Sequence, residues 1–384
     1  MTAAVVSVPL GELVALIMGQ APPGSETNFD RHGTPFVKAG EFRELRPEIR
    51  EWTTKPLRMA RQTDVLLCVV GATCGKINLG EDCAIGRSVA AIRPDSTKLN
   101  QKYLYFFMLT LVAQLRAGSM GAAQTVISRD MITSLEIPLV PLAEQQRIVG
   151  ILDEAFEGIA TAKANAEQNL RNARAIFASC LNSEIANCDQ EWPCEPIGSV
   201  CETGAGGTPL KSRNEYYDGG TIPWLLSGEV AQGEVRHAEH FITDAGLKNS
   251  SAKVFPLDTV LVAMYGATAG QVGLLKMEAA TNQAVCGIFP SRPFVPEFMF
   301  FVLRSRKAAL VAQAIGNAQP NISQAKIRST LVPMVPRALQ AKIVSKLSSL
   351  SGNVGVLESI YERKLHALDA VKKSLLHQAF SGQL

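Results

Sequence analysis

The sequence predicts an α+β protein in which two globular domains are separated by two long antiparallel coiled-coil helices, as a tandem repeat with pseudo-twofold symmetry. Three observations predict this fold class. The chain matches itself at a nearly constant offset, the first part of each copy holds short β-branched runs among glycines and prolines, and the second part has the periodicity of a long helix. The expected boundaries are 1–140 and 191–335 for the domains, and 141–190 and 336–384 for the helices.

The repeat is clearest at a glycine-rich turn. The segment 71–77 (GATCGKI) matches 266–272 (GATAGQV), so residue 71 meets residue 266 at an offset of 195. Nearer the start of each copy, Gly33 and Gly40 match Gly220 and Gly228 at offsets of 187 and 188. The offset of 195 also joins three later pairs of segments: 103–106 with 298–301, 121–128 with 316–323, and 138–141 with 333–336. A match of this length indicates two copies of one unit.

Each copy begins with a mixed segment. The runs 64–70 and 258–264 are apolar and short enough for buried strands, and a glycine turn closes each of them. The runs 89–92 and 285–289 have the same character. Two stretches have the pattern of helices that pack on the resulting sheet: 102–117 and 296–314. Both mixed segments are therefore expected to be α+β domains.

The second part of each copy has apolar residues at steps of three and four, which is typical of a coiled-coil seam. Pro141 and Pro336 suit the first turn of a helix, and a helix from Pro141 to Ile185 would be roughly 65 Å long. A stripe of this kind usually packs on its own domain, but one small domain is too short for such a helix, so each helix is expected to pair with the other. The expected seam residues are Ile148, Leu152, Ala155, Ile159, Ala162, Ala166, Ala173, Ile176 and Cys180 in the first copy, and Ile343, Leu347, Leu350, Val354, Leu357, Tyr361, Leu365, Leu368, Val371 and Leu375 in the second.

These features carry a family resemblance. A Pro-x-x-x-Gln-x-x-Ile pattern begins each helical segment, at Pro141, Gln145 and Ile148 and again at Pro336, Gln340 and Ile343, and the chain finishes with LLHQAFSGQL at 375–384. Essentially the whole chain resembles the specificity subunits of type I restriction-modification systems. One departure is that Arg337-Ala338-Leu339 lacks the acidic residue that Glu144 supplies in the first copy.

The resemblance implies two target-recognition domains, each of which recognises one half of a split site in double-stranded DNA. It also implies that the helices dock two methyltransferase subunits, and indirectly the restriction subunits. Gln145, Ile148, Gln340 and Ile343 are the implied partner-binding residues. S-adenosylmethionine, Mg²⁺ and ATP are then expected only on those partner subunits, and this chain is expected to have no cofactor of its own.

The sequence lacks the parts of a catalytic site. The turn at 71–76 is one residue too short for a phosphate-binding loop, and Ile77 stands where that loop needs Ser or Thr. Neither a methyltransferase motif of the NPPY type nor an HExxH helix is present, and the eight cysteines have no C-x-x-C pair or zinc-ligand spacing. No run of about 18 apolar residues occurs either. We therefore expect a non-catalytic protein without metal, outside the membrane, with reduced thiols in the cytoplasm.

Net charge of only +3 permits DNA binding but does not argue for it, so any basic surface must be local. Features shared by both copies cannot distinguish two half-sites, and the glycine turns and positions 87–88 and 282–283 are expected to be structural or to contact the DNA backbone. Specificity is expected where the copies diverge. The candidate DNA-binding residues are Arg31, Lys38, Arg43, Arg46, Arg50, Lys55, Arg58 and Arg61 in the first copy, and Lys211, Arg213, Asn214, Arg236, Lys248, Asn249 and Lys253 in the second.

Two other functions remain open at this point. A self-contained DNA-modifying enzyme would need the catalytic motifs that the sequence lacks. A repeat scaffold that binds only proteins would have no salt-sensitive affinity for DNA. The divergence of the two copies, next to helices that match well, favours DNA recognition over the scaffold.

Overall fold

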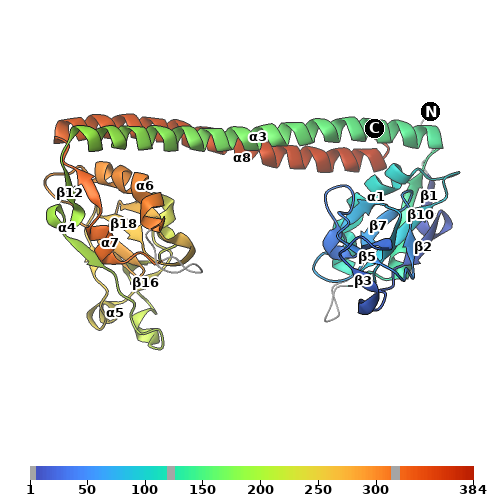
Figure 1. The fold of residues 1–384 in the computed structure, drawn as a ribbon, viewed down its shortest axis with the longest axis horizontal. Coiled ribbons are helices and arrows are strands. Elements are labelled where there is room, and N and C mark those ends of the chain that lie inside the picture. The colour runs from blue at the N-terminus through green and yellow to red at the C-terminus, as the bar shows by residue number, and fades with distance from the viewer. Residues whose placement is uncertain (1–5, 119–125, 313–320) are drawn as a thin grey trace. The chain divides into compact units, whose positions relative to one another are not determined.

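The computed structural model describes residues 6–118, 126–312 and 321–384. The repeat-matched positions 121–124 and 316–319 lie outside the described residues. The chain forms two units: unit 1 comprises Met1–Glu167 with Glu362–Leu384, and unit 2 comprises Gln168–Tyr361. Each unit contains one copy of an α+β domain together with parts of both long helices, which confirms the predicted tandem repeat (Figure 1).

Unit 1 contains two main sheets and a short strand pair. The inner sheet of unit 1 has the order β2 (Val14–Met18), β10 (Val89–Pro94), β7 (Val65–Cys68), β8 (Ile77–Leu79), and all its pairs are antiparallel. The outer sheet of unit 1 has the order β3 (Thr27–Asn28), β5 (Glu51–Thr53), β4 (Thr34–Val37), β9 (Cys83–Ile85), β6 (Met59–Ala60), with β4 and β9 parallel. The remaining elements are β1 (Val6–Pro9) paired with β11 (Glu136–Leu139), and the helices α1 (Gln101–Gly118) and α2 (Arg129–Thr133).

Unit 2 repeats this arrangement. Its inner sheet has the order β13 (Thr203–Ala205), β21 (Val285–Ile288), β18 (Val260–Ala263), β19 (Val272–Leu275), β15 (Glu234–Val235). Its outer sheet has the order β16 (Phe241–Ile242), β14 (Ile222–Leu225), β20 (Ala279–Thr281), β17 (Val254–Phe255). The remaining elements are β12 (Cys194–Pro196) paired with β22 (Leu331–Pro333), and the helices α4 (Ile197–Val200), α5 (Asp244–Lys248), α6 (Pro296–Ala312) and α7 (Gln324–Arg328).

The central strands of the inner sheets are buried on both faces, which explains their continuous apolar runs. In β7, Val65 and Leu67 belong to the core that α1 covers, whereas Leu66 and Cys68 belong to the core beneath the outer sheet. Side chains alternate in the same way along β18 of unit 2. Each inner sheet therefore serves two cores, one towards the long helices and one towards the outer sheet.

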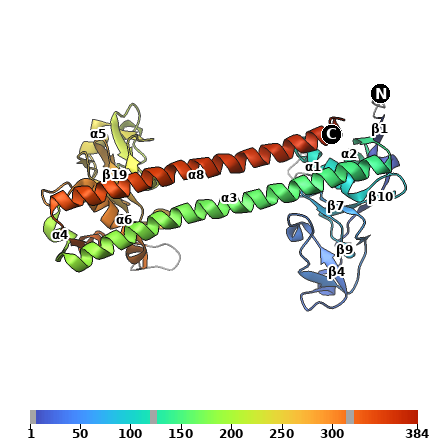
Figure 2. The ribbon, with the colours of Figure 1, turned by 90° about the horizontal axis from the view of Figure 1, so that it is seen from above.

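Two long helices follow the domains: α3 (Leu142–Glu191) and α8 (Arg337–Phe380). They pair antiparallel within each unit (Figure 2). In unit 2, Arg174 Nε lies 2.7 Å from Glu358 Oε1, and Glu184, further along α3, pairs with Lys346, earlier along α8. In unit 1, Lys163 Nζ lies 2.5 Å from Asp369 Oδ1. The helices therefore run in opposite directions, as the sequence predicts.

The seam between the helices differs from the predicted seam at three positions. Ile176, Leu357 and Val371 were expected in it, but their exposed fractions are 60%, 41% and 47%. Phe177 is buried in place of Ile176, and Glu358, next to Leu357, faces α3 in its ion pair with Arg174. A heptad seam advances alternately by three and four residues, and the sequence pattern does not fix which step comes where. The other predicted seam residues are buried or half-buried.

A pair of leucine substitutions in α8 tests this seam. Leu347 has no exposed surface, so Leu347→Ala should lower the free energy of unfolding by about 2–5 kcal/mol. Leu357→Ala makes the same change on the exposed side of the same helix and should change it by no more than about 0.5 kcal/mol. Urea unfolding of the full chain, followed by circular dichroism, measures both. An equal decrease in the free energy of unfolding for the two variants would show that the seam is misassigned.

Candidate nucleic-acid interface

The segments in which the two copies diverge build most of the outer sheets. Residues 20–62 supply β3, β4, β5 and β6 in unit 1, and residues 207–253 supply β14, β16 and α5 in unit 2, together with β15 at the edge of the inner sheet. In Figure 1, β3 lies on the side of unit 1 away from α3, and α5 lies on the corresponding side of unit 2. Most of the candidate DNA-binding residues thus lie on or beside the outer sheets, whereas Arg236 follows β15 of the inner sheet, where Glu234 lines a cavity together with Ser348 of α8.

In unit 1, four of the candidate cations already have carboxylate partners. Glu48 accepts hydrogen bonds from Arg50 Nη2 and Arg43 Nε, each at 2.7 Å, and these bonds lower the pKa of Glu48. Lys38 pairs with the buried Glu51, and Arg46 donates to the carbonyl of Gly80 and lies 3.2 Å from Glu81. The Lys38–Glu51 and Arg46–Glu81 pairs join residues far apart in the sequence, so the sequence did not indicate that these two charges are balanced.

The other four candidates in unit 1 have no carboxylate partner among the described residues. Lys55, Arg58 and Arg61 are exposed in the strand-and-turn segment that precedes β7. Arg31 is exposed as well, and its guanidinium lies 5.8 Å from the centroid of the Trp52 ring. Cations that are exposed and unpaired are the ones best able to contact DNA phosphates.

The candidate DNA-binding residues of unit 2 also include both paired and unpaired side chains. Arg213 pairs with Glu215 at 3.2 Å, and Arg236 pairs with Glu234 at 2.6 Å. Asn214 is exposed at the start of a short 3-10 helix, and Asn249 donates to the carbonyl of Ala245, next to α5. The candidates of unit 2 that are exposed without an ion pair in the described ranges are Lys211, Lys248 and Lys253.

Residues that both copies share fix the loops of the outer sheets. Glu41 and Glu229 are nearly buried, and each accepts a hydrogen bond from the backbone N–H three residues earlier, Lys38 at 2.9 Å and Leu226 at 2.7 Å. Ser88 Oγ accepts from the N–H of Ala39, and its counterpart Gln283 bonds the Thr208 hydroxyl. Positions 88 and 283 were expected from the sequence to be structural or to contact the DNA backbone, whereas no role was assigned from the sequence to Glu41 and Glu229, which follow the matched Gly40 and Gly228.

The four predicted partner-binding residues lie in or against the cores of their own units. Gln145 has no exposed surface; its amide accepts from the N–H of Asn100 and donates to the carbonyls of Lys98 and Val140, all at 2.8 Å. Gln340 makes the equivalent three bonds, to Val295, Pro293 and Val335, at 2.7–2.8 Å. Ile148 is buried in the core of unit 1, and Ile343 is half-buried against the core of unit 2. The two glutamines therefore tie each helix to its own domain and have no exposed side-chain surface, whereas Ile148 lines a cavity at the start of α3.

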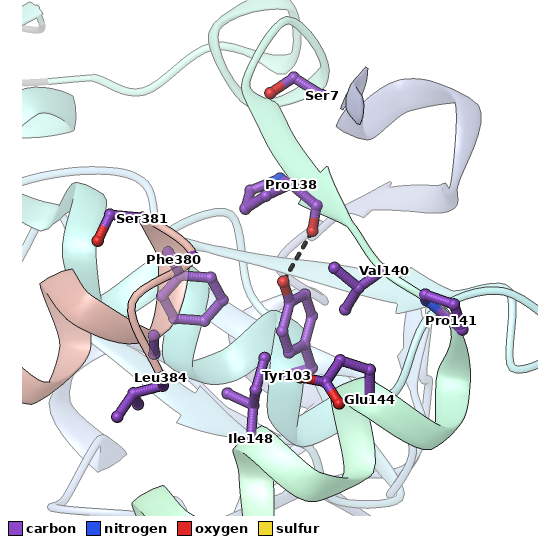
Figure 3. Close-up of a pocket in the computed structure, with 12 residues that line it drawn as sticks. Ser7, Tyr103, Pro138, Val140, Pro141, Glu144, Ile148, Phe380, Ser381 and Leu384 are labelled. Carbon is purple, nitrogen blue, oxygen red and sulfur yellow. Dashed lines mark hydrogen bonds between the residues drawn. The ribbon is translucent and has the colours of Figure 1, made fainter. Parts of the chain in front are cut away.

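A cavity of about 460 Å³ lies at the start of α3, within unit 1 (Figure 3). Tyr103 donates to the carbonyl of Pro138 at 2.7 Å, and its ring centroid lies 5.0 Å from that of Phe380. Arg147 bonds both Glu144 and the carbonyl of Leu384, and its bond to Glu144 lowers the pKa of that carboxyl. The terminal segment singled out in the sequence thus completes this cavity, which has apolar walls and a carboxylate at its rim.

The corresponding place in unit 2 has different chemistry. Arg337 replaces the apolar residue that follows the proline in the first copy, and its Nη1 donates to the carbonyls of Arg292 and Phe294, both at 2.7 Å. Leu339 occupies the position of Glu144, and 37% of its surface is exposed. The two helix starts are therefore alike in their buried glutamine and unlike in the groups around it.

The structure also bears on metal, redox and membrane chemistry. Within the described ranges, no three His, Cys, Asp or Glu side chains come together closely enough to hold a metal ion. Burial raises the pKa of Cys68, Cys83 and Cys286 to about 12, so these thiols stay protonated near neutral pH. None of the described helices has both the length and the apolar character needed to cross a lipid bilayer.

Comparisons with known proteins agree with the repeat. A family described as "Type I restriction modification DNA specificity domain" matches twice, over residues 4–170 and 190–362. The chain is also similar to the type I restriction enzyme EcoR124I/EcoR124II specificity subunit of Escherichia coli, with 26% identity over 263 residues. That match covers 66% of this chain and 64% of the relative, so the chain spans less than two thirds of that protein.

Solved structures share the fold. One chain, from work described as "Structural basis underlying complex assembly and conformational transition of the type I R-M system", has a TM-score of 0.80 at 17% identity, over 99% of this chain and 98% of that one. The HsdS subunit from Thermoanaerobacter tengcongensis has a TM-score of 0.58 at 18% identity, over 99% and 97% of the two chains. At these identities the likeness establishes the fold alone.

Substitution of Gln145 tests its structural role. Gln145→Leu keeps the size of the side chain but leaves three buried backbone groups without partners, and should destabilise unit 1 by about 2–4 kcal/mol. Gln146→Leu is the matched control, because Gln146, the next residue on α3, is exposed. Thermal and urea unfolding measure the difference. If the Gln145→Leu chain had normal stability but failed to bind a partner protein, Gln145 would be a partner-binding residue, as the sequence predicts.

Proposed function

The chain belongs to the type I restriction-modification DNA specificity family, and we propose that it recognises a bipartite target in double-stranded DNA. In this proposal the outer sheet of unit 1 binds one half-site and the outer sheet of unit 2 binds the other. The chain is the non-catalytic specificity subunit of a larger complex. It acts in the cytoplasm, where reduced thiols are the normal state of its eight cysteines.

One observation supports this assignment above the others: the two units share their inner frame and differ on their outer surface. The strands β7 and β18, the helices α1 and α6, and the buried Gln145 and Gln340 are repeated. The outer segments differ in length and sequence, and they contain the unpaired cations. A protein that binds two different half-sites needs this division, since a repeated frame can position two surfaces while each surface selects its own bases.

The helices are proposed to dock two methyltransferase subunits, which in turn recruit the restriction subunits. S-adenosylmethionine, Mg²⁺ and ATP would bind those partners. The apolar residues that lie outside the seam support this role, because they leave an exposed apolar face on the helices of unit 2: Ile176, Val356, Leu357 and Ile360. The cavity beside Tyr103 and Phe380 offers unit 1 a second apolar place for a partner side chain.

The two competing functions make different predictions about the same preparation. A self-contained DNA-modifying enzyme would turn over with the purified chain alone. A scaffold that binds only proteins would leave the DNA affinity of its partners unchanged. Binding of labelled duplex DNA at several salt concentrations, with methyltransferase subunits alone and with the chain added, separates all three.

Exchange of the outer segments tests the half-site assignment. If residues 20–62 are replaced by those of a relative with a different target, one half of the methylated site should change and the other should stay, because each unit has its own cores. Replacement of residues 207–253 is the reciprocal control and should change only the other half. Methylation mapping of DNA exposed to the reconstituted complex gives both sites. A change in both halves from either exchange would contradict the assignment.

The long helices provide a second test, because a helix that connects two recognition surfaces fixes the gap between half-sites. Four residues inserted in both helices, after Ala162 and after Asp369, keep the Lys163–Asp369 pair in register. They add about 6 Å at 1.5 Å per residue, close to two base pairs at roughly 3.4 Å each. The mapped gap should lengthen by one or two base pairs.

Two residues inserted at both places form the control for this experiment. They turn the seam by roughly half a turn at 3.6 residues per turn and should impair folding of the paired helices. A folded chain with the four-residue insertions that kept the original gap would show that partner subunits, rather than the helices, set the spacing.

A further inference from the structure

Phe29 is the large apolar side chain with the greatest exposed fraction among the described residues, at 75%. It follows β3 directly, in the loop that leads to β4 on the outer sheet of unit 1. In Figure 1, β3 lies at the side of this unit away from α3. Single exposed apolar residues are common on protein surfaces, so the exposure of Phe29 alone does not indicate a function.

Hydrogen bonds of Asn28 constrain the loop around Phe29. Asn28 Oδ1 accepts from the N–H groups of Asp30 and His32, both at 3.1 Å, and Asn28 Nδ2 donates to the carbonyl of His32 at 2.9 Å. Gly33 has φ = +93°, and a Cβ there would lie 2.4 Å from the carbonyl oxygen of Thr53. These contacts constrain the backbone on both sides of Phe29, whose ring is exposed.

Arg31 adds a positive charge to the same loop. Its backbone has φ = +63°, an unfavourable value for a residue with a side chain. The guanidinium lies over the ring of Trp52 on β5, at 5.8 Å from the centroid, and has no ion pair among the described residues. Stacking on Trp52 orients the guanidinium, so the loop presents an apolar ring and an oriented cation a few residues apart.

The second copy does not have this device. At the offset of 187 that matches Gly33 with Gly220, Phe29 corresponds to the half-buried Tyr216, and Arg31 corresponds to Asp218. The aromatic residues nearby point inwards: the rings of Tyr217 and Trp224 pack edge to face at 5.9 Å, and the Tyr217 hydroxyl donates to Pro209. An exposed ring beside an unpaired arginine thus occurs in this loop of unit 1 and not at the matched position of unit 2.

We propose that Phe29 is a specificity-determining wedge: its ring inserts against one base step of the half-site bound by unit 1 and partly unstacks it, while Arg31 contacts the adjacent phosphate. Apolar side chains held at a fixed position beside cations act in this way in DNA-bending proteins. Pyrimidine–purine steps unstack most easily, so unit 1 selects a half-site with a TA or CA/TG step at that place. This inference rests on the proposed DNA-binding function.

The test uses the chain assembled with its methyltransferase subunits on duplex DNA whose target has been mapped by methylation. 2-Aminopurine, whose fluorescence rises when it is unstacked, replaces adenine at one position after another through both half-sites. The target bases that the methyltransferase subunits flip out of the duplex should brighten in both half-sites, and the wild-type complex should brighten one further step in one half-site only. Phe29→Ala should abolish that signal and weaken binding to the target at least tenfold, with non-specific binding unchanged, and Phe29→Trp should retain both properties.

Phe241→Ala is the matched control. Phe241 is an exposed phenylalanine on the outer sheet of unit 2, at 42%, so the same chemical change there should leave the first half-site's signal intact. Phe29→Ala must also unfold at the wild-type temperature, since the ring is mostly exposed.

The outcomes separate the wedge from the proposed function. Absence of a brightened step that depends on Phe29, or full target affinity for Phe29→Ala, overturns the wedge while specific DNA binding stands. Loss of assembly with the methyltransferase subunits in Phe29→Ala assigns the ring to a protein contact and overturns it as well. Failure of the wild-type complex to bind any mapped target overturns the proposed function itself, and the wedge with it.

Discussion

The rest of each unit depends on one buried amide. Gln145 and Gln340 lie in the first turns of α3 and α8, and each ties three backbone groups of its own domain to the helix. An apolar side chain there would leave buried donors and acceptors unsatisfied, and a charged one would be buried without a partner. The direction in which each long helix leaves its domain is therefore fixed by hydrogen bonds.

The inner sheets transmit this constraint to the outer surface. Because β7 and β18 are buried on both faces, a shift on the helix side would disturb the core beneath the outer sheet. Glu41, Glu229, Ser88 and Gln283 then hold the outer loops by hydrogen bonds at matched positions. Sequence change in the outer segments is tolerated because these shared contacts, and not the variable residues, define the frame.

The sequence was sufficient for the repeat, the buried strands, the helices and most of the seam, because each of these has a local or periodic signal. The sequence predictions differed from the structure where packing in three dimensions decides which side chains are buried or paired. Ile176 and Phe177 are both apolar, and only packing selects which one enters the seam. Gln145 is polar and was taken as a partner contact, but a polar residue on a helix can equally be a buried tether. The Lys38–Glu51 and Arg46–Glu81 pairs join residues of separate strands or loops, so no spacing rule could reveal them.

The distribution of charge explains why the net charge of the chain does not indicate DNA binding. In unit 1, the carboxylates of Glu48, Glu51 and Glu81 balance the cations nearest the middle of the outer sheet. Among the candidate DNA-binding residues of unit 1, the cations without an ion pair in the described ranges lie in two short places, the loop with Arg31 and the segment from Lys55 to Arg61. A surface with so few free cations gains modest non-specific affinity, so discrimination must come from shape and from contacts placed accurately against the bases. A fixed loop presenting an aromatic ring satisfies that requirement, whereas a broad basic patch would bind many sequences alike.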